Sequence, residues 1–316
     1  MSRPQNILVG VDLSRAKQLT PSELSPPTVT AIEQGMHLAA QWRARLTFFC
    51  ALDVSPERQA LLADGDGVEG ALRQAHAVLH DLAERAAAEG IEAAALVAAG
   101  APWIEIIQQV QRTQHDLVIV GTRDLGMAGR LLFGSTGLKL LRHCPCPVWV
   151  ARPDADPQEV NILVASDLSD VSERALALGV EVAKLSGAKF HLVHALQNQS
   201  VGALRWMETP ESVFEEARDQ DREQAERALR EQLARTDYRT LPFGVRLEVI
   251  DGSPENVILD LIEAGGIDLL VMGTRGRSGF QGLVIGNTAE RLLPQANCSL
   301  LAVKPDDFQC PVSLDE

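Results

Sequence analysis

The sequence predicts an α/β fold made of two doubly wound, parallel-sheet domains in tandem. Three observations support this prediction: segments in the first half recur in the second, the two halves begin alike, and strand-like and helix-like segments alternate in each half. The recurring segments share one separation along the chain and start at Gly100-Ala-Pro and Gly252-Ser-Pro, at Asp116-Leu-Val and Asp268-Leu-Leu, and at Gly134-Ser-Thr and Gly286-Asn-Thr. A shared separation indicates duplication of one unit.

The start of each copy and the stretch between them locate the domain boundary. Asn6-Ile-Leu-Val opens the first copy and Asn161-Ile-Leu-Val opens the second. Between the copies, residues 152–158 are polar, contain two prolines and lack apolar periodicity, which is typical of a linker. We therefore expect one domain over residues 1–153 and a second over residues 154–316.

Short apolar runs and helical periodicity predict the elements of each domain. For the second half, strands are expected at 161–166, 189–196, 245–250, 268–272 and 299–303, with helices at 172–185, 211–235, 254–264 and 287–295. For the first half, strands are expected near 6–11, 46–52, 91–98, 116–120 and 147–151. An insertion rich in Pro, Ser and Thr, residues 16–28, is expected to form a mobile loop over the strand ends.

Composition narrows the classes of function. The 316 residues carry a net charge of -14 and a pI near 5.0, which argues against nucleic acid or a membrane surface as the partner. No apolar stretch reaches the ~18–20 residues of a membrane span, no secretory signal is evident, and a cytoplasmic protein is expected. The five cysteines form no disulfide framework and are expected to be small buried residues. Neither Cys144-Pro-Cys146 nor the His76/His80 pair has further ligands nearby, so no metal site is expected.

Open parallel sheets bind ligands at the carboxyl ends of their strands, where the strand order reverses. The first strands end at Asp12 and Asp167, and the second strands end near Ala51 and Ala195. Each aspartate can equally be a turn or helix-capping residue, and that alternative stays open. In the second half, the fourth strand leads into a glycine-rich turn that opens the last helix.

Gly273 and Gly276 are expected to bend this turn with positive φ and to let the backbone approach a ligand. Gly286-Asn-Thr then begins the last helix, whose unpaired N–H groups would form an anion site. The order of these residues, after a buried strand and before a helix, predicts a cradle for phosphates.

The spacing Gly273-x2-Gly276-x9-Gly286 and the repeated halves resemble the universal stress protein family in its tandem form, and the resemblance covers both halves. It implies Rossmann-like domains that associate through their last strands, residues 147–152 and 299–304, as an internal pseudo-dimer, with a homodimer as a further assembly. For the nucleotide-binding branch it implies ATP or AMP as ligand, with Mg²⁺ as a companion of ATP.

By position, the resemblance implies a nucleotide site in the second half that comprises Ala165, Ser166, Asp167, Ala195, Met272, Gly273, Arg275, Gly276, Gly286, Asn287 and Thr288. A weaker site in the first half would comprise Asp12, Ala51, Gly121, Arg123, Gly134, Ser135 and Thr136. Two departures from the family pattern affect these sites. Asn287 replaces the usual Ser/Thr after the third glycine, and Asp124 stands where the second glycine of the first half belongs. A carboxylate there would repel phosphate, so the second half is the better candidate.

The function that the resemblance implies is binding and signalling in a stress response, through protein partners that the sequence does not identify. The chain lacks a Walker Lys-Ser/Thr pair and an ordered nucleophile–base arrangement, so at most weak, incidental ATPase activity or autophosphorylation is expected. Two alternatives stay open. One is a nucleotide-independent module for a hydrophobic or lipid-like ligand, and the other is an adaptor that acts through protein partners.

Overall fold

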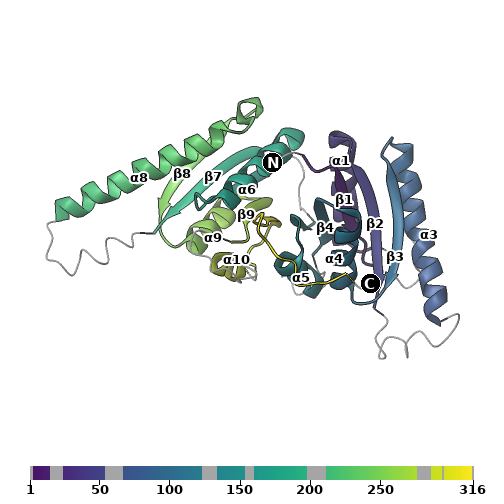
Figure 1. Ribbon diagram of the computed structural model, residues 1–316. Coiled ribbons are helices and arrows are strands. Elements are labelled where there is room, and N and C mark those ends of the chain that lie inside the picture. The colour runs from purple at the N-terminus through teal and green to yellow at the C-terminus, as the bar shows by residue number, and fades with distance from the viewer. Residues whose placement is uncertain are drawn as a thin grey trace. The chain divides into compact units, whose positions relative to one another are not determined.

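The computed structural model describes residues 3–14, 24–53, 67–122, 134–153, 160–197, 211–275, 286–293 and 295–314 (Figure 1). The chain divides into two compact units. One, called here the N-terminal unit, contains Ser2–Ala155 together with Asp307–Glu316, and the other, the C-terminal unit, contains Asp156–Asp306. The chain therefore returns to the N-terminal unit after completing the C-terminal one, which the sequence did not lead us to expect.

The N-terminal unit is built around a parallel sheet with strand order β3-β2-β1-β4-β5. Its elements are β1 (Asn6–Gly10), α1 (Pro26–Trp42), β2 (Arg45–Leu52), α3 (Gly67–Ala88), β3 (Ala93–Ala99), α4 (Pro102–Thr113), β4 (Leu117–Gly121), α5 (Ser135–His143) and β5 (Val148–Ala151). The strand order turns back after β3, so right-handed crossovers place α1 and α3 on one face and α4 and α5 on the other. In Figure 1, α3 runs along β3.

The C-terminal unit repeats this plan with strand order β10-β9-β6-β7-β8, also all parallel. Its elements are β6 (Asn161–Ala165), α6 (Asp170–Ser186), β7 (Lys189–Leu196), α8 (Glu211–Ala234), a 3₁₀ turn (Tyr238–Thr240), β8 (Val245–Asp251), α9 (Pro254–Gly265), β9 (Leu269–Gly273), α10 (Asn287–Leu292) and β10 (Ser299–Val303). The prediction of two tandem doubly wound domains is confirmed. Strands β7 and β10 have the predicted bounds.

The recurring sequence segments make the same backbone contacts in both units. The N–H of Gly100 donates to the carbonyl of Leu52 at 2.9 Å, and the N–H of Gly252 donates to that of Leu196 at 3.1 Å. Both glycines have a positive φ, 155° and 148°, which a residue with a side chain rarely adopts. The glycine of the recurring Gly-x-Pro segment is therefore required by the turn that precedes α4 and α9.

A second pair of equivalent contacts lies at the amino ends of the sheets. The Asp116 carboxylate accepts hydrogen bonds from the backbone N–H groups of Gln5 and Asn6, at 2.7 and 2.9 Å. The Asp268 carboxylate accepts one from the N–H of Asn161 at 2.7 Å. These two aspartates recur because each one binds the backbone at the start of the first strand of its unit.

Many predicted boundaries differ from the observed ones by one or two residues, and proline explains two larger differences. Helix α1 begins at Pro26, so residues 26–28 are helical and not part of a loop; the fixed φ of proline favours the first helical positions. Residues 16–23 of that predicted loop lie outside the described residues, and residues 24–25 precede the helix without regular structure. Helix α10 ends at Leu292 and not at residue 295. Pro294 has no N–H with which to extend it.

Within the described ranges, every helix is too short or too polar to cross a lipid bilayer.

Candidate functional site

Strands β6 and β9 of the C-terminal unit are neighbours on either side of the point where the strand order reverses. Ala165 and Met272 pair in register, so the two strands end at the same level of the sheet. Ser166 and Asp167 follow the first strand, and Thr274 follows the second. The fold therefore brings together the carboxyl-end residues that the sequence singled out.

Thr274 fixes the end of β9 to its surroundings. Its backbone N–H and hydroxyl both donate to the carbonyl of Val303 on β10, at 2.9 and 3.3 Å. Its own carbonyl accepts the N–H of Gly286, which caps α10. Because this Gly286 N–H is engaged within the protein, an anion at the start of the helix would meet Asn287, which is exposed, and Thr288, which is half-buried.

Gly273 is a glycine for a different reason than predicted. It is the last residue of β9 and does not have a positive φ, so that part of the prediction is wrong. A Cβ at this position would lie 2.9 Å from Cγ1 of Val171 on α6. At the equivalent Gly121, a Cβ would lie 2.5 Å from the carbonyl oxygen of Pro27 on α1. Both glycines let the first helix of the unit pack against the end of the fourth strand.

Asp167 shapes the turn between β6 and α6. Its Oδ1 accepts hydrogen bonds from the N–H and the hydroxyl of Ser169, at 3.1 and 2.6 Å. The Ser169 hydroxyl in turn caps α6 by accepting the N–H of Ser172. In the N-terminal unit, Asp12 accepts the N–H of Ser14 at 2.9 Å. These contacts support the turn-forming alternative for both aspartates, and any ligand contact would be additional to it.

A buried polar cluster lies directly behind this turn. The Ser166 hydroxyl lies 3.0 Å from the hydroxyl of Ser172 and 3.1 Å from Oε1 of Gln232, and the three residues are between 2% and 8% exposed. The Ser166 carbonyl lies 2.8 Å from Nδ1 of His194 on β7. The cluster connects β6, β7, α6 and α8 at the candidate site. Sequence reasoning missed Gln232 and Ser172, because nothing in their local sequence marks them.

The remaining predicted residues of this site are only partly placed. Ala195 lies on β7, two residues beyond the partner of Ala165, and is half-buried. Arg275 is half-buried and follows Thr274 directly. Gly276 and the residues up to 285 lie outside the described residues. The structure therefore shows the two ends of the predicted phosphate cradle.

The corresponding edge of the N-terminal unit has the same framework. The Thr122 N–H donates to Ala151 as Thr274 does to Val303. Gly134 precedes α5 with φ -63° and ψ 159°, close to the -72° and 153° of Gly286. Asp12 and Ser135 are exposed, whereas Ala51 and Thr136 are half-buried. Arg123 and Asp124 lie outside the described residues.

Two arginines of α8 lie at the carboxyl end of β8. Arg222 donates to the carbonyl of Val249 at 2.7 Å and to Oδ2 of Asp251 at 2.6 Å, and Arg218 reaches the same oxygen at 2.9 Å. Both guanidinium groups are partly exposed, so the ion pairs contribute little to stability. They fasten the long helix to the edge strand and were not predicted.

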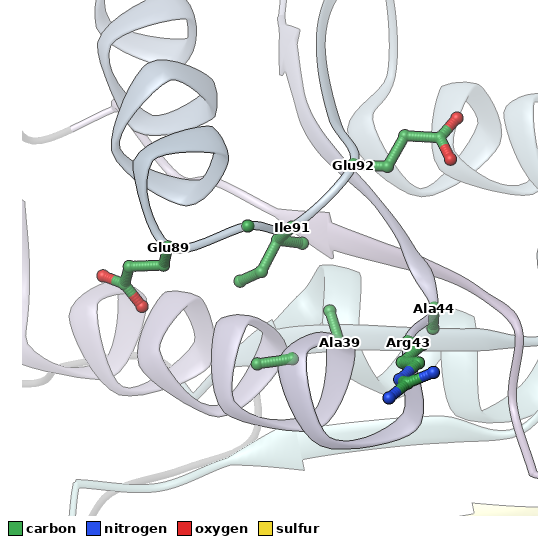
Figure 2. A pocket seen from close by; sticks show the side chains of 8 residues that line it. Ala39, Arg43, Ala44, Glu89, Ile91 and Glu92 are labelled. Carbon is green, nitrogen blue, oxygen red and sulfur yellow. The ribbon is translucent and has the colours of Figure 1, made fainter.

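A surface hollow of about 350 Å³ lies at the opposite end of the N-terminal sheet, between the end of α1 and the turn from α3 to β3 (Figure 2). Ala39 and Ile91 form part of its apolar lining. The carboxylates of Glu89 and Glu92 lie on opposite sides of Ile91 (Figure 2). The charged groups do not converge on one point, so the hollow lacks the arrangement of a polar binding site.

The cysteine and histidine predictions can also be compared with the structure. Cys50, Cys144, Cys146 and Cys298 are buried free thiols, as predicted, whereas Cys310, which was also expected to be buried, is half-buried. His76 and His80 lie with their rings 6.3 Å apart on α3. His80, Asp81 and Glu84 form the one group of potential metal ligands found among the described residues, and all three are exposed. The expectation that the histidine pair has no further ligands nearby is therefore wrong for His80.

Comparison with known proteins agrees with the duplicated fold. The universal stress protein family matches the chain twice, over residues 4–152 and 160–304. Universal stress protein E of Escherichia coli K12 is 29% identical over 329 aligned residues, which cover 100% of this chain and 99% of that protein. Universal stress protein E of Photorhabdus laumondii is 27% identical, with 99% and 98% of the two chains covered.

Two solved structures share the fold over nearly the whole chain. A functionally unknown protein of Pseudomonas aeruginosa PAO1 superimposes with a TM-score of 0.66 at 22% identity and covers 96% of this chain and 94% of its own. A universal stress protein of Archaeoglobus fulgidus has a TM-score of 0.62 at 20% identity, with 95% and 98% covered. The chain belongs to the universal stress protein family, with one family domain in each half.

Proposed function

We propose that the protein binds an adenine nucleotide, AMP or MgATP, at the carboxyl edge of the C-terminal sheet and acts in a stress response as a binding protein. One observation carries this proposal: the ends of β6 and β9 pair in register, and Thr274 ties the start of α10 to the same point. A strand-order reversal flanked by a helix start is where α/β sheets take nucleotides.

The groups at this edge divide into two sets. The turn at Ser166 and Asp167, with Ala195 beside it, offers backbone and apolar surface for the adenine and ribose. Arg275, Asn287 and Thr288 offer cationic and neutral donors for phosphate. Gly276 belongs to the phosphate loop by its place in the family motif. Asn287 donates through its amide in place of the usual hydroxyl.

The N-terminal edge is proposed to bind nucleotide weakly. Its framework matches that of the C-terminal edge, but Asp124 replaces the glycine that corresponds to Gly276. A carboxylate next to phosphate adds like-charge repulsion. The expected stoichiometry is therefore one tightly bound nucleotide per chain.

Nucleotide binding is proposed to act through protein partners and not through hydrolysis of the nucleotide. The sequence lacks the Lys-Ser/Thr pair that P-loop enzymes place against the β- and γ-phosphates. Asp167, the aspartate of the proposed site, already accepts two hydrogen bonds within the turn through Oδ1. Hydrolysis, where it occurs, is expected to be slow and incidental.

Isothermal titration calorimetry with AMP and with MgATP tests the proposal. The wild-type chain should bind one nucleotide, and Gly276→Asp, which copies the residue of the first half, should weaken binding at least tenfold. The converse variant Asp124→Gly should retain binding at the C-terminal unit and increase the stoichiometry toward two nucleotides per chain. Circular dichroism melts of each variant check that the fold is intact. A wild-type chain without heat of binding up to millimolar nucleotide would refute the proposal.

A further inference from the structure

The last described residues of the chain lie outside helices and strands and belong to the N-terminal unit. Residues 308–314, called here the tail, follow the C-terminal unit in sequence but belong to the N-terminal unit by their contacts. Phe308, Cys310 and Val312 are half-buried, whereas Gln309 and Ser313 between and beside them are exposed. The alternation of half-buried and exposed residues indicates that one side of the tail lies against the unit, and the chain bends at Pro311.

Two glutamines of α4 hold the main chain of the tail. Gln111 donates from Nε2 to the carbonyl of Val312 at 3.0 Å, and Gln108 donates from Nε2 to the carbonyl of Ser313 at 3.2 Å. Arg112 donates to Oε1 of Gln108 at 3.3 Å, which turns the amide so that its N–H₂ faces the tail. Hydrogen bonds to the main chain are a common source of affinity in peptide binding.

A third contact comes from the end of α5. The Cys310 thiol lies 3.4 Å from the carbonyl of His143, and Leu140 and Leu141 of the same helix are fully buried beneath. A thiol is a weak donor, so this contact orients the tail more than it holds it. The surface that receives the tail is thus formed by α4 and the end of α5.

The duplicated helix of the C-terminal unit provides an internal comparison. At the positions of Gln108 and Gln111, helix α9 has Asp260 and Glu263, and both are exposed. Carboxylates cannot donate a hydrogen bond to a carbonyl at neutral pH. The amide donors are therefore a feature of α4 alone, and they are located where the tail lies.

We propose that the surface of α4 and α5 is a binding site for a short non-helical peptide with apolar side chains at alternate positions, and that its resident ligand is the tail of the same chain. The tail is held by a few hydrogen bonds and is half-exposed, so its docking is reversible. Its covalent attachment gives it an effective concentration on the order of millimolar, which keeps the site filled. A free peptide of the same pattern competes only near that concentration.

The rate of Cys310 alkylation in the full-length protein measures the docked state, because Cys310 is the one cysteine among the five that is not buried. In Gln108→Glu/Gln111→Glu, which introduces acidic side chains like those of α9, Cys310 should react with iodoacetamide at least tenfold faster than in the wild type. Gln114→Glu is the matched control, since Gln114 donates to the carbonyl of Gln111 and not to the tail. Peptide mapping by mass spectrometry assigns the reaction to Cys310.

Competition in trans tests the site itself. A synthetic peptide of residues 307–314 carrying Cys310→Ser should, at millimolar concentration, accelerate alkylation of wild-type Cys310 and leave the double variant unchanged. Equal rates in the wild type, the double variant and a free-peptide thiol would overturn the docking. Absence of acceleration by the peptide would overturn the binding site. Rates that depend on protein concentration would place the tail on a second copy and overturn its assignment to its own chain.

Should the double variant fold poorly, Gln111→Glu alone supplies the same comparison with one partly buried side chain changed. Hydrogen exchange of the tail amides in that variant should be faster than in Gln114→Glu. Equal exchange in the two variants would contradict the assignment of Gln111 as a tail contact.

Discussion

The Ser166 hydroxyl accepts a hydrogen bond from the backbone N–H of Leu168 at 3.1 Å, and Leu168 has a φ of 65°. A leucine in the left-handed region costs roughly 1–2 kcal/mol relative to its ordinary conformations. In the N-terminal unit Val11 replaces the serine, and the equivalent Leu13 does not adopt a positive φ. The hydroxyl of Ser166 thus stabilises a strained turn at the candidate nucleotide site.

Ser166→Ala should destabilise the C-terminal unit by about 1–3 kcal/mol, because the Leu168 N–H loses its acceptor and Oε1 of Gln232 loses its donor, the Ser166 hydroxyl. Urea denaturation monitored by circular dichroism measures the change. Ser186→Ala is the control: its hydroxyl makes only a long contact, 3.4 Å, to the carbonyl of Val182 on the same helix. A Ser166→Ala chain as stable as Ser186→Ala would contradict a stabilising role for the cluster.

Gly273→Ala should destabilise the C-terminal unit by about 1–3 kcal/mol, because its Cβ would lie 2.9 Å from Val171 Cγ1. The loss should be smaller when Val171→Ala has removed that methyl group. A double-mutant cycle in urea should therefore give a coupling of at least about 0.5 kcal/mol. Additive effects would show that Gly273 is needed for another reason, such as close approach of a ligand.

The sequence predicted the framework of the fold well, and physical reasons explain where it succeeded. Strand β10 is an apolar run after Ser299, and strand β7 is mostly apolar despite two histidines; turn residues flank both strands, so their bounds are visible locally. Because the unit is duplicated, the pattern of strands and helices occurs twice in the sequence. The tail could not be predicted, because its contacts depend on amides of α4 that have no local pattern linking them to residues 312 and 313.

The candidate site was predicted in outline but not in its supporting contacts. Its strand ends follow from parallel-sheet topology, which places Asp167 and Gly273 at one edge. The contact between Ser166 and Gln232 joins residues 66 positions apart, and only tertiary packing creates it. Gly273 was correctly singled out but assigned the wrong cause, since a sequence does not distinguish a glycine with positive φ from one that admits a neighbouring helix.

His115 should make the stability of the N-terminal unit pH-dependent. It is 4% exposed and lies within hydrogen-bond distance of Thr47 and Thr113. Burial is the main cause that lowers the pKa of His115 below its ordinary value; the backbone of Gln109 and then Asp116 raise this pKa in part, and Arg45 lowers it slightly. The unfolded chain, with a histidine pKa of about 6.5, then binds more protons than the folded chain.

The stabilising contribution is therefore full above about pH 6.5 and is lost as the pH falls toward the lowered folded pKa of His115. His115→Ile, which copies Ile267 of the second half, should remove up to about 1.4 kcal/mol per pH unit from the slope of unfolding free energy in that window. Urea titrations in steps of about one pH unit, from about pH 5 to about pH 7, measure this slope. Identical slopes in wild type and variant would show that the folded and unfolded pKa values of His115 are equal.

Native thiol reactivity should be confined to Cys310. Burial, with a smaller contribution from Asp12, raises the pKa of Cys50 to about 12, and the contact with Cys144, followed by burial, raises that of Cys146. The thiolate is the reactive species, so these buried groups stay inert near pH 8. Ellman's reagent should therefore titrate one thiol in the native chain and all five in guanidinium chloride. Cys310→Ser should abolish the native reaction. A thiol that still reacts fast in that variant would show that one of the buried cysteines becomes exposed in solution.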